Sequence, residues 1–193
     1  MPPRTKFSRA QIVEAAFDIA KKEGTASLTI RRVADALGSS IAPIYVNFET
    51  VDDLIEAVLE EVVALSQRLI AQQQTGNPFR DIGMASLSLA RDYPHLFRDL
   101  ISVQKKQMQR HQAELSPELV QAMRQDPELE GLSDDQLSQL LLRMRVFQMG
   151  LSFMIANDLL PEAESEEAQI ALLLDTGADL ISGMKQGGEQ GNV

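Results

Sequence analysis

The stretch LTIRRVADALGSSIAPIYVNF, residues 28–48, decides which fold this sequence adopts. Its apolar residues recur at helical spacing and predict a short helix that begins near Thr29. Gly38 ends that helix, because glycine accepts the left-handed backbone that follows a helix end. The Ser39-Ser40 pair then forms the turn and N-cap of a shorter helix, in which Pro43 is tolerated because first-turn amides lack acceptors within the helix.

Two short helices joined by a tight turn and braced by a preceding helix form a helix-turn-helix. This arrangement lays its second helix in the major groove of DNA. The bracing helix is predicted to start at Ser8, with a capping box to Gln11, and to end at Gly24. A small core can fix the angle between the two short helices, and its members are Val33, Ala34, Leu37, Ile44 and Phe48.

The periodic segments after Phe48 also have helical spacing, so the predicted fold class is all-α. Thr50 with Asp53 caps a long helix that joins the two halves of the chain, and a loop follows at residues 75–78. Further helices are predicted at about 79–91, 94–110 and 116–125, from Ser133 with its capping partner Gln136 to about Asp158, and from about Ser165 to Met184. The predicted domains are a DNA-binding domain over 1–48, a helical domain over 49–185 and a disordered tail over 186–193.

The net charge of −10 is divided unevenly along the chain. Residues 1–48 hold seven basic against four acidic side chains, a net charge of +3, and the remainder holds eleven against twenty-four, a net charge of −13. A basic head on an acidic body presents the head to DNA phosphates while the body repels misplaced DNA. Chance asymmetry in a small domain is the alternative explanation.

Composition and motifs argue against several other classes of function. The sequence has no cysteine and only two histidines, His95 and His111, so we predict no metal site and no cofactor. It contains no glycine-rich phosphate loop, nucleophile elbow or His-Glu-x-x-His motif, so an enzyme is not expected. No apolar run approaches the roughly 18 to 20 residues that span a bilayer, and the N-terminus lacks a signal-peptide core. A cytoplasmic protein is therefore expected, with no membrane partner.

Residues 8–60 resemble the tetracycline-repressor-like (TetR) family of bacterial regulators. The resemblance rests on Leu28-Thr29, Val33-Ala34, Leu37-Gly38, Ile44-Tyr45, Phe48 and Asp52-Asp53-Leu54. Beyond residue 60, helix count and length match the family but side chains diverge. The resemblance implies a homodimeric repressor on a near-palindromic double-stranded DNA operator, with a small-molecule effector and the dimer contacts in the domain over 49–185.

The resemblance also implies which residues touch DNA. Thr29 and Tyr45 would contact phosphates, and Arg31 would reach a base edge, because its planar guanidinium can bond guanine O6 and N7 together. A solvated surface charge is the alternative for Arg31, and core packing is the alternative for Tyr45. The predicted contacts are Thr29, Arg31, Arg32, Ser40, Ile41, Ala42, Pro43, Tyr45 and Asn47, with Arg4 and Lys6 on a flexible N-terminal arm.

The second short helix departs from the family pattern because it carries no cation. Family members usually place lysines just after the aromatic position, where this sequence has Glu49 and Val51. Its readout would therefore rely on apolar contacts with thymine methyl groups, together with Asn47 and Tyr45. A helical adaptor that uses the same uncharged helix to bind protein is the competing interpretation.

The C-terminal helices are expected to supply a dimer interface and an effector pocket. Small and apolar residues on the last two long helices suit a four-helix interface: Gly150, Ser152, Leu173, Gly177, Leu180 and Ile181. Where the central helices converge, methionines and aromatics with polar anchors suit a pocket: Tyr93, His95, Phe97, Arg98, Met108, Met144, Phe147, Phe153 and Met154. The competing interpretation of both sets is the internal core of one chain.

Overall fold

The computed structural model describes residues 7–103, 119–121, 123–161 and 165–190. Within these residues every regular element is helical, which confirms the all-α fold class. In chain order the elements are α1 (Arg9–Glu23), η1 (Thr25–Ser27), α2 (Ile30–Ala36), α3 (Ala42–Tyr45), α4 (Val51–Gln73), α5 (Pro78–Asp92), α6 (Pro94–Val103), η2 (Pro127–Leu129), α8 (Asp134–Ala156) and α9 (Glu166–Gln190). None of the described helices combines the length and the apolar character that crossing a membrane requires.

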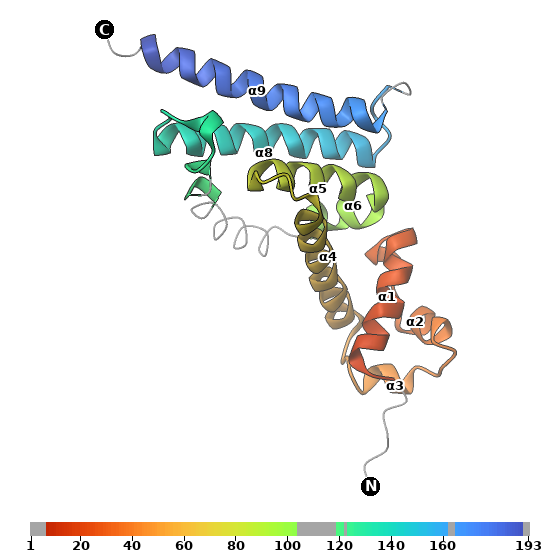
Figure 1. Ribbon diagram of the computed structural model, residues 1–193. Helices are drawn as coiled ribbons and strands as arrows, with labels where there is room; N and C mark the ends of the chain where they lie inside the picture. The colour runs from red at the N-terminus through yellow and green to blue at the C-terminus, as the bar shows by residue number, and fades with distance from the viewer. Residues whose placement is uncertain (1–6, 104–118, 122, 162–164, 191–193) are drawn as a thin grey trace.

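Two groups of helices are joined by α4 (Figure 1). The first three helices form a small N-terminal group, and α8 and α9 run side by side at the other end of the molecule, with α5 and α6 next to α8. The long helix α4 packs on α1 at one end and on α5 at the other. The short helix α6 packs on α5 and α8 but also contacts α1 and η1, so it links the body to the N-terminal group.

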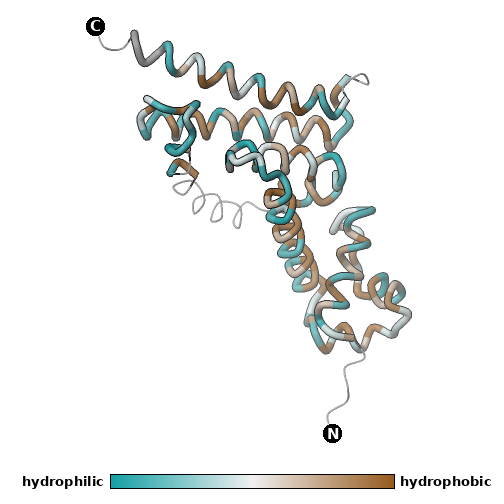
Figure 2. The backbone as a smooth tube through the Cα atoms, in the orientation of Figure 1, coloured by the Kyte–Doolittle hydropathy of each residue, from teal (hydrophilic) through white to brown (hydrophobic). Residues whose placement is uncertain are grey.

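Buried apolar residues fall into separate cores. Figure 2 shows hydrophobic residues recurring along α4 and through the paired helices α8 and α9. The N-terminal core combines residues of α1, α2 and α3 with Leu96 of α6 and with four residues of α4, namely Leu54, Ala57, Val58 and Val62. This core therefore continues past Phe48, where the sequence placed the domain boundary. A second core lies between α5, α8 and α9, and a smaller one joins α6 to α8 around Phe97 and Ala156.

Three of the helices start at capping boxes, as the sequence predicted. The boxes pair Ser8 with Gln11 in α1, Thr50 with Asp53 in α4 and Ser133 with Gln136 in α8. Each box satisfies two backbone amides that have no acceptor within the helix. Because these bonds are local, they place the helix starts independently of the tertiary structure.

The start of α3 differs from the prediction. Ile41, and not the Ser39-Ser40 pair, precedes the first helical residue, and no side chain caps the helix. Ile41 already has helical backbone angles, φ −70° and ψ −20°, whereas a serine cap requires an extended residue at that position. The predicted Ser40 cap is therefore wrong.

The C-terminal end also differs from the prediction. Helix α9 continues past Met184 to Gln190, so residues 186–190 of the predicted disordered tail are helical. Extending an existing helix is easier than starting one, because each added residue gains a backbone hydrogen bond without a new nucleus. Gln186 Nε2 also donates to Ser182 Oγ at 3.2 Å. The predicted helix over 94–110 is described only to Val103, as α6.

Candidate nucleic-acid interface

A small core holds α2 and α3 at a fixed angle. Val33 and Ala34 from α2, Ile44 from α3 and the following Phe48 are all buried, and Leu37 packs partly buried against them. Complete burial of a valine or isoleucine side chain contributes about 1.5–3 kcal/mol. The five residues that the sequence picked for this core therefore do fix the geometry of the two short helices.

Gly38 allows the tight turn between α2 and α3. Its φ of +60° lies in the left-handed region, which glycine adopts without a clash from a Cβ atom. The Gly38 amide donates to Asp35 O at 3.1 Å, and the Ser39 amide donates to Ala34 O at 2.9 Å. These are the paired bonds of a Schellman motif, which closes a helix and redirects the chain. The predicted end of the helix at Gly38 is confirmed.

The segment around α3 presents an apolar surface to solvent. Ile41, Tyr45 and Val46 are 48%, 52% and 68% exposed. Ser40 and Ala42 are also exposed, beside a half-buried Pro43. In a helix-turn-helix this second helix is the one that enters the major groove.

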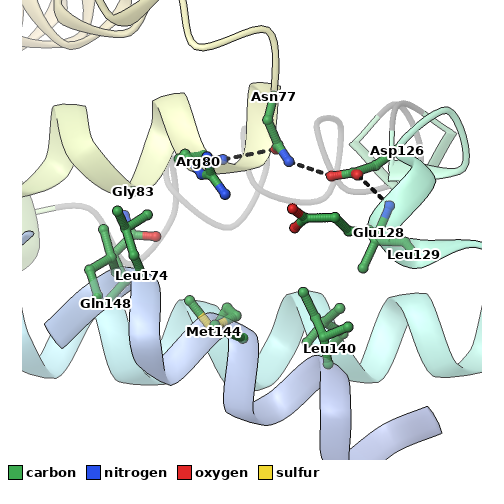
Figure 3. A pocket seen from close by; sticks show the side chains of 14 residues that line it. Asn77, Arg80, Gly83, Asp126, Glu128, Leu129, Leu140, Met144, Gln148 and Leu174 are labelled. Carbon is green, nitrogen blue, oxygen red and sulfur yellow. Dashed lines mark hydrogen bonds between the residues drawn. The ribbon is translucent and has the colours of Figure 1, made fainter. Parts of the chain in front are cut away.

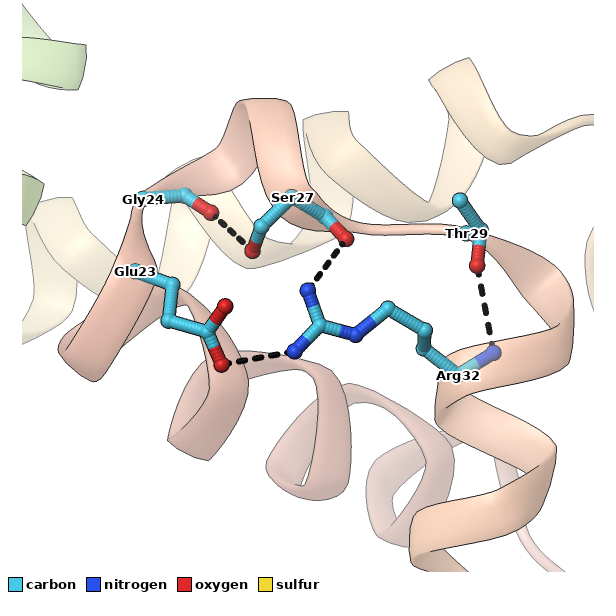
Figure 4. A network of polar contacts seen from close by, with 5 residues as sticks. All are labelled: Glu23, Gly24, Ser27, Thr29 and Arg32. Carbon is cyan, nitrogen blue, oxygen red and sulfur yellow. Dashed lines mark hydrogen bonds and ion pairs between the residues drawn. The ribbon is translucent and has the colours of Figure 1, made fainter.

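Arg32 is used inside the N-terminal group (Figure 4). Its Nη2 donates to Glu23 Oε1 at 2.6 Å and its Nη1 donates to Ser27 O at 3.1 Å. The hydrogen bond from Arg32 lowers the pKa of the Glu23 carboxyl, and the same bond raises the pKa of Arg32. Arg32, which was predicted to contact DNA, thus ties α2 to the end of α1 and to η1.

The remaining predicted DNA contacts lie in different settings. Arg31 is exposed on α2, one position before Arg32. The Thr29 hydroxyl accepts from the Arg32 amide at 3.1 Å as the N-cap of α2. Asn47 Nδ2 donates to Pro43 O at 3.0 Å, which ties its amide to the α3 backbone. Arg4 and Lys6 lie outside the described residues.

These helices match a known family of proteins. Residues 12–58, from within α1 to within α4, match the family model described as bacterial regulatory proteins of the tetR family. The match covers 47 of the 193 residues, so the similarity to this family lies in the N-terminal group and the start of α4. The matched residues include both helices of the helix-turn-helix, α2 and α3.

Solved TetR-family structures share this fold over most of the chain. A TetR variant from Acinetobacter baumannii AYE in complex with minocycline is 17% identical, with 94% of this chain and 98% of that one covered and a TM-score of 0.59. SmeT, the repressor of the Stenotrophomonas maltophilia multidrug efflux pump SmeDEF, is 18% identical, with 90% and 89% covered and a TM-score of 0.60. BioQ with its natural double-stranded DNA operator is 21% identical, with 90% and 99% covered and a TM-score of 0.52. Among curated proteins, none matches.

The body of the chain contains a pocket between α5, η2, α8 and α9 (Figure 3). Its apolar wall includes Leu129, Leu140, Met144 and Leu173, and its polar rim comes from two loop ends. On that rim Asn77 Nδ2 donates to Asp126 Oδ2, Asn77 Oδ1 accepts from the Arg80 amide at 3.1 Å, and Asp126 Oδ1 accepts from the Glu128 amide at 2.9 Å. The pocket is partly open to solvent and its free space is about 80 Å³, so only a compact group can enter it without a shift of a helix.

Of the residues predicted for the effector pocket, Met144 lines this one. Phe97 is buried between α6 and α8, Phe147 is partly buried in the body core, and Phe153 and Met154 are exposed. His95 and Arg98 contact each other, Tyr93 lies near α1, and Met108 lies outside the described residues. Sequence reasoning missed the rim, although the Asn77-Pro78 and Asp126-Pro127 pairs mark both loop ends.

Most residues predicted for the dimer interface face the interior of their own chain. Ser152 is 0% exposed with its Oγ 3.0 Å from Ser86 Oγ, and a Cβ on Gly177 would lie 3.5 Å from Met144 Cε. Leu173, Leu180 and Ile181 pack in or against the body core, and only Gly150 is exposed. The exposed large apolar side chains of these two helices are Leu142, Val146, Phe153 and Met154 on α8 and Leu172 on α9.

The Arg32–Glu23 pair predicts a pH-dependent stability. Because the Glu23 pKa is lowered below 4.5 in the folded chain, the pair stabilises the fold above that pH and its contribution is lost as pH falls through the folded pKa. We expect Arg32→Gln to lower the Tm at about pH 6. The difference from wild type should narrow at a pH well below 4.5, where the loss of the Arg32–Ser27 bond, which does not titrate, remains. Thermal unfolding followed by circular dichroism measures both.

Arg31→Gln, a change one residue away on the exposed side of α2, is the matched control and should show no such pH dependence. The pair is solvent-exposed, so the effect should be small and should weaken further at high salt. A Tm difference that is the same at both pH values would contradict the role assigned to this pair.

Proposed function

We propose that the chain is a homodimeric repressor that binds a near-palindromic operator and is released by a small-molecule effector held in the domain after α4. The observation that carries this proposal is that α6 packs against both the N-terminal group and the body of the molecule. An effector can change DNA binding only if it favours one arrangement of the DNA-binding group over another. A helix that contacts the body and the DNA-binding group is suited to that transfer.

On the side of the N-terminal group, α6 and the residue before it make three contacts. Leu96 is completely buried in the N-terminal core. The Asp99 carboxylate accepts a hydrogen bond from the Thr25 amide at 2.6 Å, at the start of η1. Just before α6, the Tyr93 ring lies 5.6 Å from Lys21 Nζ in a cation–π contact with α1. Movement of α6 would therefore pull on the segment that leads into α2.

On the side of the body, α6 is tied to the end of α8. Arg98 Nη1 donates to Ala156 O at 3.1 Å and lies 3.4 Å from Asn157 Oδ1. The first of these bonds supplies a donor to the Ala156 carbonyl, at the end of α8, where backbone carbonyls have no partner within the helix. Helix α8 also supplies Leu140 and Met144 to the pocket. A continuous set of contacts thus leads from the pocket through α8 and α6 to α2.

The effector and repressor parts of the proposal draw on the relatives. The A. baumannii protein is solved with minocycline, SmeT is described as a repressor, and BioQ is solved on its operator. Such proteins are regulators and not enzymes, and we propose the same here. DNA in the bacterial cytoplasm would be the partner.

The dimer surface that we propose is the exposed apolar side of α8 with the adjoining part of α9. Leu142 and Val146 are 60% and 66% exposed and lie one helical turn apart, and Gly150 and Phe153 continue the row. Contiguous exposed apolar side chains on two paired helices suit a second copy of the same surface in a two-fold dimer. The dimer would place two α3 helices on two half-sites.

Binding to the DNA upstream of the chain's own gene tests the proposed regulator. We expect the full-length chain to retard that duplex, and Arg31→Ala to weaken binding about 5- to 150-fold, the loss typical of one bidentate arginine–guanine contact. Arg68→Ala, an exposed arginine of α4 paired with Glu61, should bind as wild type. Fluorescence anisotropy gives the affinities.

Deleting the gene should raise expression of a reporter from the same DNA, as a repressor requires. Absence of binding, or an Arg31→Ala variant that binds as tightly as wild type, would contradict the proposed DNA contact. Lower reporter expression after deletion would indicate an activator.

Charge on the proposed dimer surface should separate the subunits. We expect the double variant Leu142→Glu, Val146→Glu to sediment as a monomer and to lose operator affinity by at least about tenfold, because buried unpaired carboxylates are costly. Gln67→Glu, on the exposed side of α4, adds charge elsewhere and should leave the dimer intact. Analytical ultracentrifugation distinguishes the two states. A double variant that remains a dimer would show that the subunits pair through another surface.

A further inference from the structure

We propose that the segment Ile41–Val46 selects its half-site through the 5-methyl groups of thymine, which Ile41, Tyr45 and Val46 would contact in the major groove. The inference rests on the proposed function, because it requires this surface to lie on DNA. It adds the chemical feature of the operator that the surface recognises, and it identifies the specificity-determining residues.

The first support is where the exposed apolar side chains lie. Within the described residues up to Val103, the large hydrophobic side chains that are exposed are Ile41, Tyr45 and Val46, all within one run of six residues. Elsewhere in the N-terminal group, residues of this size are buried or half-buried in the core. An exposed apolar cluster on an otherwise polar surface marks a contact with a partner.

The second support is that this segment has few side chains that could form hydrogen bonds to base edges. Hydrogen-bond readout of a base pair relies on groups such as arginine, asparagine or glutamine that make paired bonds to one base edge. The amide of Asn47 donates to Pro43 O, and the guanidinium of Arg32 is engaged by Glu23 and Ser27. Within α3 itself, the Tyr45 hydroxyl is the one side-chain hydrogen-bonding group, because Ala42, Pro43 and Ile44 have none.

The third support is the chemistry of the groove. Hydrogen-bond donors and acceptors cover the floor of the major groove, and the thymine methyl is its apolar feature. When an exposed isoleucine or valine covers a thymine methyl group, removing both from water stabilises the complex. When it covers a hydrogen-bond donor or acceptor instead, that group is left unpaired, which destabilises the complex. The surface therefore favours A·T pairs whose methyl lies beneath it.

The spacing of the three residues sets the spacing of the methyls. Ile41 and Tyr45 are four residues apart, which is about 6 Å along a helix and places them on the same side. Base pairs are stacked about 3.4 Å apart, so the two side chains are about two base-pair steps apart. Each half-site should thus carry thymines within about two steps of each other, while exposed Arg31 on α2 reads a flanking position.

The test starts from a duplex selected by the full-length chain from a random-sequence library. Each thymine of the enriched half-site is then replaced by deoxyuridine, which removes the methyl and keeps the base pairing. We expect at least one position per half-site to weaken binding about fourfold, the factor for one buried methyl group. Replacing the same T·A pair by 5-methylcytosine·G should bind more tightly than replacing it by cytosine·G.

A double-mutant cycle then assigns the methyl to a side chain. In Ile41→Ala or Val46→Ala, we expect the deoxyuridine effect at the matching position to fall below about twofold, because the contact is already lost. Arg31→Ala is the control: it should weaken binding and leave the deoxyuridine effect unchanged. Both α3-segment variants alter exposed side chains, and far-UV circular dichroism checks that the fold is kept.

The outcomes separate the two proposals. No enriched duplex would overturn the proposed function together with this inference. An enriched duplex that tolerates deoxyuridine at every thymine, or one whose deoxyuridine effect is unchanged in all the α3-segment variants, would leave the DNA-binding function standing and overturn the methyl readout.

Discussion

The contact between α6 and the segment before α2 is the constraint on which the rest of the structure depends. Asp99 accepts from the Thr25 amide at 2.6 Å, and Leu96 is buried in the N-terminal core. Gly24 lies next to this carboxylate, since a Cβ atom at this position would be 3.4 Å from Asp99 Oδ2. Its φ of +83° is one that residues other than glycine rarely adopt. A charged hydrogen bond contributes about 1.5–3 kcal/mol. The coupling free energy between distant sites is typically about 1–3 kcal/mol. The Asp99–Thr25 bond is therefore strong enough to carry such a coupling between the body and the N-terminal group, and weak enough to break when the body changes.

The contact between α6 and the segment before α2 also determines which neighbouring side chains are used within the fold and which stay exposed. Arg32 ties α2 to Glu23 and Ser27, which lie two residues before and two residues after Thr25, so the position of α2 depends on the segment that Asp99 holds. Arg31 stays exposed, as its proposed contact with DNA requires. The segment around α3 then presents an exposed apolar surface. The proposed readout of thymine methyl groups depends on the fit of this surface to the groove, so it requires that α3 be held rigidly. The Schellman turn at Gly38 and the core around Ile44 supply that rigidity.

Local features of this fold could be predicted from sequence, and long-range choices could not. Capping boxes and the glycine turn involve residues three to five apart, so their chemistry is visible in the chain. The Asp99–Thr25 bond joins residues 74 positions apart, and no local pattern indicates it. Arg31 and Arg32 are adjacent and are the same residue type, so the sequence does not show which of them faces Glu23. In the structure it is Arg32. Helix α8 is apolar on several sides, so its sequence could not show that Leu140 is internal while Leu142 and Val146 are exposed. That ambiguity explains why the predicted interface residues lie mostly inside the chain.

Amide hydrogen exchange at Thr25, measured by NMR in wild type and in Asp99→Ala, tests the central claim most directly. Loss of a charged acceptor worth about 1.5 kcal/mol should raise the exchange rate of this amide by about tenfold or more. Asp99→Asn keeps an acceptor oxygen and should fall between the two. The Phe48 amide, which donates to Ile44 O at 3.0 Å within the helix-turn-helix core, is the internal reference and should not change. Faster exchange confined to the Thr25 region would support α6 as the link between the body and the N-terminal group. An unchanged Thr25 amide in Asp99→Ala would contradict it.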